Sequence, residues 1–212
     1  METLYVVATP IGNLKDITLR ALEVLKSVEI ILAEDTRVTR KLLSHYGIHK
    51  PVLRYLPGRN YERFHNIAFV SDAGTPAVSD PGTKLVRELS AAGFKIVPIP
   101  GASALSAIVS ASDIDLSEFL FLGFPPHKKG RQTFFKRAAS SEVPVIIFEY
   151  PHRILKTLKE LESAAGERRV NIGRELTKIY EEVFRGSVWE ALEHFKGGRE
   201  RGEFVLVLDR KV

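Results

Sequence analysis

The chain has 212 residues, of which 44% are hydrophobic and 27% are charged, enough for one large or two small domains with packed cores. It contains no cysteine, which excludes disulfides, thiol catalysis and cysteine-based metal sites. The six histidines are scattered along the sequence, and no apolar run approaches the roughly 18 residues of a membrane span, so we expect neither a metal site nor a membrane partner.

The formal net charge is +5 and the sequence pI is about 9.4. A basic balance favours nucleic acid or another polyanion as a partner, although a solubilising surface charge explains it equally well. Met1 leads straight into a strand-like segment without the features of a signal sequence, which predicts a cytoplasmic location.

The first half of the chain alternates apolar runs with segments of helical spacing, the pattern of a mostly parallel α/β sheet. Helices are indicated by leucines at 19, 22 and 25, and by residues 41–46, 84–89 and 104–111. Strands are expected at 3–8, 29–33, 52–55, 67–70 and 95–98.

Four of these strands end in loops of unusual composition, at 9–13, 34–37, 71–82 and 100–104. The loop 71–82 alone holds two glycines, two prolines, two serines and two aspartates. Glycine admits a ligand close to the backbone, and proline keeps the loop rigid. Because open α/β sheets bind ligands at the carboxyl ends of their strands, we expect a bound ligand here. The alternative is that the loops only connect elements, with Asp35 or Asp80 capping a helix.

The composition changes at 112–115, which predicts a domain 1–113 followed by a domain 114–212. Several strands of the second half follow one another through short links, so we expect antiparallel pairs and a mixed sheet. The stretch 127–137 has five basic residues and two phenylalanines, and is the best candidate for a patch that contacts phosphates. An amphipathic helix with a solvated basic face is the alternative.

The loop sequences together resemble one family over nearly the whole chain. The segments that carry the resemblance are 8–14, Ala33-Glu34-Asp35-Thr36-Arg37, Ser71-Asp72-Ala73-Gly74-Thr75-Pro76, Asp80-Pro81-Gly82, 98–104, Gly123-Phe124, Tyr150-Pro151-His152-Arg153 and 174–178. They are similar to the small-subunit ribosomal RNA 2′-O-ribose methyltransferases of the tetrapyrrole-methylase superfamily.

The resemblance implies two α/β domains, with a mostly parallel sheet in the first, a mixed sheet in the second and S-adenosylmethionine in the cleft between them. It also implies a homodimer and the methylation of a cytidine 2′-hydroxyl in the 16S RNA of the small ribosomal subunit. The cofactor-binding residues that it implies are Pro10, Gly12, Asp72, Gly74, Thr75, Pro76, Gly101, Ala102 and Ser103, with Phe204 and Val205 of the last strand closing over the cofactor.

A ribose hydroxyl is a weak nucleophile, so a general base is expected beside it. The candidates at the predicted strand ends are Glu34, Asp35 and Asp72, and Lys178 could serve if burial lowers its pKa. Each carboxylate could instead be a helix cap or part of a structural ion pair. The basic residues predicted to contact RNA are Arg37, Lys128, Lys129, Arg131, Arg153 and Arg174.

Two other functions stay open at this point. The chain could be a methylase of the same superfamily that acts on a tetrapyrrole or a protein side chain, although the basic balance argues against it. It could also be a non-catalytic RNA-binding module, which would leave the four loops unexplained. A nucleotide hydrolase is disfavoured because the sequence has no P-loop Gly-Lys-[Ser/Thr].

Overall fold

The computed structural model describes residues 2–211. Contacts divide the chain into two compact units, Met1–Ser103 and Ala104–Val212. The division falls before the boundary predicted at residue 113, because helix α4 (Ala104–Ala111) packs on strand β10 (Phe204–Leu208) of the second unit.

The first unit is built on a five-stranded sheet in the order β3-β2-β4-β1-β5, and every pairing in it is parallel. All five predicted strands are present, with ends that differ by a residue or two. They are β1 (Thr3–Val7), β2 (Ile30–Ala33), β3 (Val52–Arg54), β4 (Asn66–Val70) and β5 (Lys95–Ile99).

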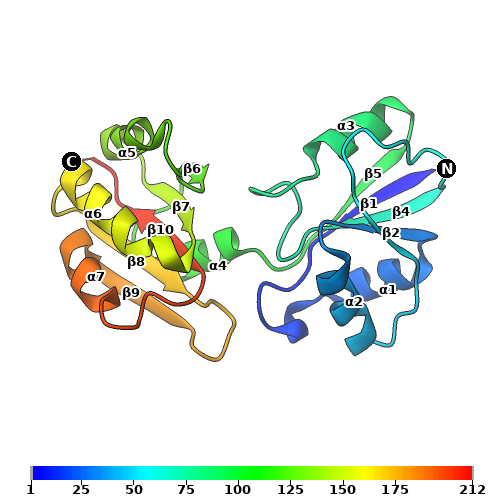
Figure 1. The fold of residues 1–212 in the computed structure, drawn as a ribbon, viewed down its shortest axis with the longest axis horizontal. Helices are drawn as coiled ribbons and strands as arrows, with labels where there is room; N and C mark the ends of the chain where they lie inside the picture. The colour runs from blue at the N-terminus through cyan, green and yellow to red at the C-terminus, as the bar shows by residue number, and fades with distance from the viewer. Residues whose placement is uncertain (1, 212) are drawn as a thin grey trace. The chain divides into compact units, whose positions relative to one another are not determined.

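Helices cover both faces of this sheet (Figure 1). Successive strand residues point to opposite faces, so Ile31 packs with helices α1 (Leu19–Ser27) and α2 (Thr36–His45), whereas Leu32 packs with α3 (Thr83–Ala91). Apolar strands buried on both faces are typical of parallel sheets. Helix α2 begins well before the predicted residue 41.

The second unit also has a five-stranded sheet, in the order β6-β7-β10-β8-β9. Strands β6 and β7 are parallel, and the other pairs are antiparallel, which confirms the predicted mixed sheet. Its other strands are β6 (Leu120–Gly123), β7 (Val145–Glu149), β8 (Arg169–Arg174) and β9 (Glu182–Ser187).

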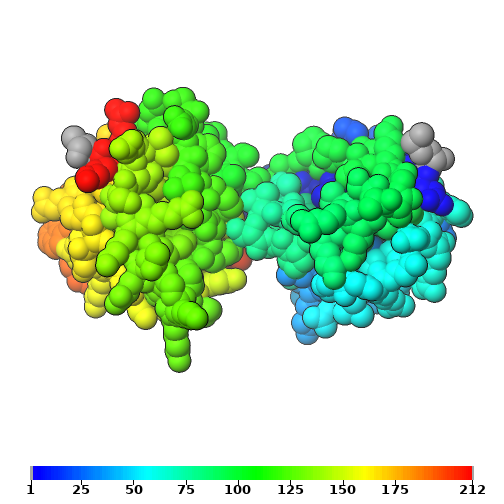
Figure 2. Space-filling view, turned by 90° about the horizontal axis from the view of Figure 1, so that it is seen from above, coloured from blue at the N-terminus to red at the C-terminus, as the bar shows by residue number. Residues whose placement is uncertain are grey.

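Three helices of the second unit, α5 (Arg131–Ser140), α6 (Ile154–Ala165) and α7 (Val188–Phe195), pack in one core with inward residues of the sheet. A short 3-10 turn, η2 (Pro151–Arg153), leads into α6. The main-chain N–H of Lys211 donates to the carbonyl of Ser141 at 2.9 Å. The end of the chain, red in Figure 2, therefore lies against the yellow-green surface of this unit.

Among residues 2–211, none of the helices has both the length and the apolar character that crossing a membrane requires.

Candidate active site

The loops after β1 and β4 meet at the carboxyl edge of the first sheet. Thr9 and Gly74 exchange two main-chain hydrogen bonds of 2.9 Å, which form an isolated antiparallel bridge. The hydroxyl of Thr9 also donates to the carbonyl of Ser71 at 3.3 Å. Because β1 and β4 are neighbouring parallel strands, both loops leave the sheet at the same edge, and these bonds fix them to one another.

The loop after β5 joins the same assembly. The hydroxyl of Thr75 donates to the carbonyl of Ala102 at 3.4 Å. A Cβ at Gly101 would lie 3.0 Å from the Cβ of Ala8, so glycine lets this loop pack closely on the end of β1. The predicted cofactor residues of three loops are thus neighbours. Pro10 and Pro76 are buried among them, whereas Gly12 is exposed and Ser103 is half-buried.

The backbone of the loop 71–82 is unusual. Gly74 has φ +77°, and a Cβ there would lie 3.2 Å from the side chain of Ile11. Ala77 and Ser79 also have positive φ, at 68° and 65°. Such conformations cost non-glycine residues about 1–3 kcal/mol each and are concentrated at functional sites. The loop is therefore held in a shape that local preferences oppose.

Three carboxylates, Glu34, Asp72 and Asp80, influence one another at this edge. Asp72 accepts a 2.8 Å hydrogen bond from the main-chain N–H of Asp35, which ties the loop after β4 to the end of β2. Burial, and then the negative charge of Asp72, raise the pKa of Glu34. In the ion pairs between described residues, none of the three carboxylates has a basic partner.

Asp80 lies in the same group of carboxylates, although the sequence suggested only a helix cap for it, within a segment that carries the family resemblance. The residue at the cap position of α3 is Gly82, and Asp80 instead lies with the other carboxylates. Burial and the charges of Glu34 and Asp72 raise its pKa from 3.8 to about 6, against a hydrogen bond from Ser71 that lowers it. The available signal was its place in the same Gly/Pro loop as Asp72.

Asp35 has a structural role. Its carboxylate accepts the main-chain N–H of Arg37 at 2.8 Å and caps helix α2, as the alternative interpretation stated. Its ion pair with the Arg37 guanidinium, at 2.6 Å, and the cap bond hold the pKa of Asp35 well below its usual range. The Arg37 side chain itself is 84% exposed and accessible to a phosphate.

Lys178 could act as a base only if its pKa were lowered, and the structure does not lower it. Burial alone would lower the pKa of Lys178, but hydrogen bonds to Glu175 and Glu203, both 2.9 Å, raise it on balance. The sequence made the role of Lys178 conditional on a lowered pKa, and its pairing with Glu175 and Glu203 cannot be recognised from the sequence.

Two of the predicted RNA contacts, Arg131 and Arg153, are wrong as surface residues. Their side chains are only 6% and 8% exposed. Arg153 pairs with the fully buried Glu149 at 3.0 Å, and Arg131 pairs with Glu160 at 2.6 Å and lies 3.9 Å from Glu149. These guanidinium groups therefore neutralise internal carboxylates and do not face a nucleic acid.

The remaining basic candidates differ in accessibility. Lys128 and Lys129 are exposed in the loop that precedes α5 and are free of the helix face that the alternative assigned to them. The Arg174 side chain is 15% exposed, and it is held by Glu182 at 3.5 Å and by the carbonyl of Arg201 at 2.7 Å. We retain Lys128 and Lys129 as the basic pair most available for phosphates.

The last strand offers less to a ligand than expected. The Phe204 ring packs edge-on against Phe195 in the core, with ring centroids 5.3 Å apart. Val205 points to the opposite face and is 2% exposed, beside Gly173. The side chain of Phe204 is therefore committed to the core, and its strand is paired on both sides, with β7 and with β8.

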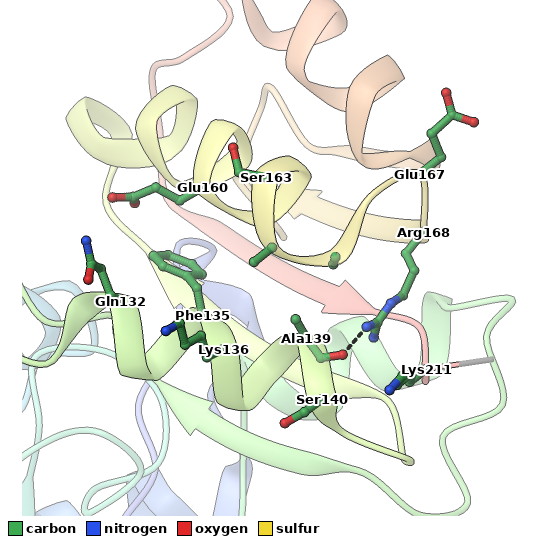
Figure 3. Close-up of a pocket in the computed structure, with 12 residues that line it drawn as sticks. Gln132, Phe135, Lys136, Ala139, Ser140, Glu160, Ser163, Glu167, Arg168 and Lys211 are labelled. Carbon is green, nitrogen blue, oxygen red and sulfur yellow. Dashed lines mark hydrogen bonds between the residues drawn. The ribbon is translucent and has the colours of Figure 1, made fainter.

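A cavity of about 1090 Å³ lies between α5 and α6 of the second unit. Its lining includes Phe135 and Ala139 on α5, with Lys136, Arg168 and Lys211 around them (Figure 3). The Arg168 guanidinium donates to the carbonyls of Ala139 and Asp209, so it is used in holding the fold together. None of the lining residues belongs to the predicted cofactor loops.

Within residues 2–211, no group of three or more His, Cys, Asp or Glu side chains is placed to hold a metal ion.

A family model described as Tetrapyrrole (Corrin/Porphyrin) Methylases matches residues 3–192. The chain belongs to this family. Among its curated relatives, a ribosomal RNA small subunit methyltransferase I of Neisseria meningitidis is 47% identical and covers 97% of this chain and 75% of its own. The protein of the same name from Thermotoga maritima is 42% identical over the full length of both chains.

Solved structures of other methylases share the fold. A putative diphthine synthase of Entamoeba histolytica has a TM-score of 0.71 and 17% identity, covering 100% of this chain and 94% of its own. A cobalt precorrin-4 methyltransferase of cobalamin biosynthesis has a TM-score of 0.68 and 18% identity, covering 97% and 94%. At these identities the likeness supports the α/β fold and carries no conclusion about substrate.

A methylase of this family implies S-adenosylmethionine as the methyl donor, and the edge of the first unit fits such a group. Because Gly74 and Gly101 have no side chains, the loops pack closely and their main-chain groups lie close to the surface. Asp72 is exposed and negatively charged groups surround it, which suits the ribose hydroxyls and ammonium of the cofactor.

Proposed function

We propose that this chain methylates the 2′-hydroxyl of a cytidine in the 16S RNA of the small ribosomal subunit, with S-adenosylmethionine as donor. The observation that carries the proposal is the similarity of 42–47% over 97–100% of the chain to proteins named for methylation of small-subunit ribosomal RNA. The cytidine and the 2′-oxygen come from the loop motifs and their resemblance.

S-adenosylmethionine supplies an already activated methyl group, so the chain has to align the acceptor and remove its proton. The loops carrying Gly74, Thr75, Gly101 and Ala102 bind and orient the cofactor. Asp72 lies beside them and contributes a carboxylate to the same site. Arg37, which is exposed next to this edge, binds a phosphate of the substrate.

We place the role of proton acceptor on Asp80. A base works best when its pKa is near the working pH, and the pKa of Asp80 is raised to about 6. Asp35 is less suited because its pKa is lowered and its carboxylate caps α2. Lys178 is protonated and held by two carboxylates. Burial, together with the negative charges of Glu34 and Asp72, keeps the pKa of Asp80 high.

The alternative substrates have weaker support. The solved structures whose names indicate a tetrapyrrole or a protein substrate are 17–18% identical, whereas the ribosomal RNA methyltransferases are more than twice as similar. A non-catalytic RNA-binding module would have no use for the strained loop 71–82 and its carboxylates. We further propose that the chain forms a homodimer and acts in the cytoplasm. Light scattering would test the homodimer.

The test is transfer of labelled methyl from S-adenosylmethionine to small ribosomal subunits and to naked 16S RNA, with the product mapped by nuclease digestion and mass spectrometry. We expect one 2′-O-methylcytidine in the RNA. Methyl groups on a base, on ribosomal protein or on a tetrapyrrole would contradict the proposal, as would cofactor binding without transfer to any of these substrates.

A further inference from the structure

The carboxyl ends of the parallel strands β6 and β7 carry three aromatic rings in a stack. Phe124 directly follows β6 and Tyr150 directly follows β7, so the parallel pairing brings the two side by side. Their ring centroids are 4.5 Å apart with planes at 16°. His152 extends the stack, 6.0 Å from Tyr150 and at 18° to it.

The stack is accessible at its outer end. Tyr150 is 43% exposed, His152 is exposed, and Phe124 is half-buried. Parallel, offset stacking is one of the arrangements that aromatic pairs prefer. Because Tyr150 lies between Phe124 and His152 in the stack, the His152 ring is the one at its open end.

The surrounding residues fix this geometry. Phe148 packs edge-on against Phe124, at 5.5 Å and 65°. The buried guanidinium of Arg153 lies 5.8 Å from the Tyr150 ring, and it is itself held by Glu149 at 3.0 Å. The buried ion pairs thus hold the rings in place, and a bound ligand would meet a preorganised surface.

A basic loop continues directly from the stack. Arg153 donates to the carbonyl of Pro125, and Arg131 donates to the carbonyl of Pro126 at 3.1 Å. These bonds attach the loop to the same buried network, and the next residues include the exposed Lys128 and Lys129. Aromatic faces beside exposed cations are the combination that binds unpaired nucleotides, through base stacking and phosphate contacts.

We propose that His152, backed by Tyr150 and Phe124, forms a stacking platform for an unpaired base of the RNA substrate, with Lys128 and Lys129 on its phosphates. This inference rests on the proposed function for the identity of the substrate. It assigns the platform to substrate binding, whereas the methyl-transfer chemistry belongs to the first unit.

The test is binding of a fluorescein-labelled single-stranded oligocytidylate, followed by anisotropy over a series of salt concentrations. Loss of one stacked base weakens binding by about 5- to 150-fold. We expect that loss for His152→Leu at every salt concentration, with an unchanged salt slope because Lys128 and Lys129 are not altered. His152→Phe keeps an aromatic ring and should bind like the wild type.

Trp189→Leu is the matched control, because Trp189 is 52% exposed on α7 and has no place in the platform. It should leave binding unchanged, and thermal melting should show all three variants folded. The inference is overturned if the wild type does not bind the oligonucleotide or if His152→Leu binds it like Trp189→Leu. It is also overturned if His152→Leu weakens binding of duplex RNA as much as binding of the single strand. Because this assay does not use methyl transfer, its failure is distinct from failure of the proposed function.

Discussion

Two edges of the molecule are each formed by the carboxyl ends of parallel strands. They differ in whether their carboxylates have basic partners. At the ends of β2 and β4, Glu34, Asp72 and Asp80 lie together and the pKa of Asp80 rises to about 6. At the ends of β6 and β7, the buried Glu149 is matched by Arg131 and Arg153. The first edge retains unbalanced charge, and the second neutralises it.

The difference separates a reactive site from a support. Glu34 and Asp80 are half-buried, and a partly buried charge without a basic partner costs stability, so such groups are candidates for chemistry. A neutralised buried carboxylate is inert, and its partners can position other groups, here the aromatic rings of the second unit. The comparison can be tested by removing a carboxylate from each edge, since the effects on stability should have opposite signs.

The largest expected effect is at the neutralised edge. Glu149→Leu leaves the buried guanidinium of Arg153 without its carboxylate, while Arg131 keeps Glu160, and a broken buried pair costs about 3–5 kcal/mol. Urea unfolding followed by the fluorescence of Trp189, the single tryptophan, reports on the unit that contains the change.

Glu193→Leu serves as the control for this prediction, because Glu193 forms a surface ion pair with Lys196 that is 46% exposed. Its effect should stay under about 1 kcal/mol. A Glu149 variant no less stable than this control would show that the buried network is not a support.

The opposite sign is expected at the reactive edge. Because the pKa of Asp80 is higher in the folded chain, folding binds its proton more tightly, and this stabilisation is lost as the pH rises from about 4 through 6. Asp80→Asn removes the charge that is disfavoured at neutral pH. We expect the first unit to gain on the order of 1 kcal/mol at pH 7, discounted because Asp80 is partly solvated.

Hydrogen exchange of the amides of β4 and α3, corrected for its intrinsic pH dependence, measures this gain. At pH 4 the variant and the wild type should be equally protected. A variant less stable than the wild type at pH 7 would mean that Asp80 is neutralised as Glu149 is.

The smallest effect concerns the basic loop beside the aromatic platform. Replacing Lys128 and Lys129 by Gln should lower the salt slope of RNA binding by roughly 0.7–0.9 for each phosphate that the variant no longer neutralises. Cofactor affinity, measured by calorimetry, should stay the same. Arg131 is left intact in this test because its loss would destabilise the unit. An unchanged slope would remove both lysines from the RNA-binding surface.

The sequence was sufficient to predict the fold because buried residues recur at regular spacings along strands and helices. Apolar runs such as those of β1 and β4 are covered on both faces, and the Gly/Pro loops punctuate them at the correct strand ends. That the loops of Thr9 and Gly74 lie close together could be predicted, since neighbouring parallel strands end at the same edge of a sheet.

The errors have a common physical cause. A basic residue looks the same in a sequence whether it faces water or a buried carboxylate, and the partners of Arg131 and Arg153 lie far along the chain or on another element. The pKa values of Lys178 and Asp80 depend on partners in the same way. The aromatic platform was missed because its rings come from separate strand ends.

The central claim is that the carboxylates of the first unit perform the proton transfer, and single-turnover methylation of small ribosomal subunits tests it most directly. Rates would be measured across pH for the wild type and for Asp80→Asn, with Asp35→Asn as the control carboxylate and with cofactor affinity determined for each. We predict that the wild-type rate rises with pH and levels off above about 6, following Asp80. Asp80→Asn should lose at least about 100-fold with cofactor affinity retained, and the control should lose far less. A near-full rate for Asp80→Asn, with an unchanged pH profile, would contradict the account.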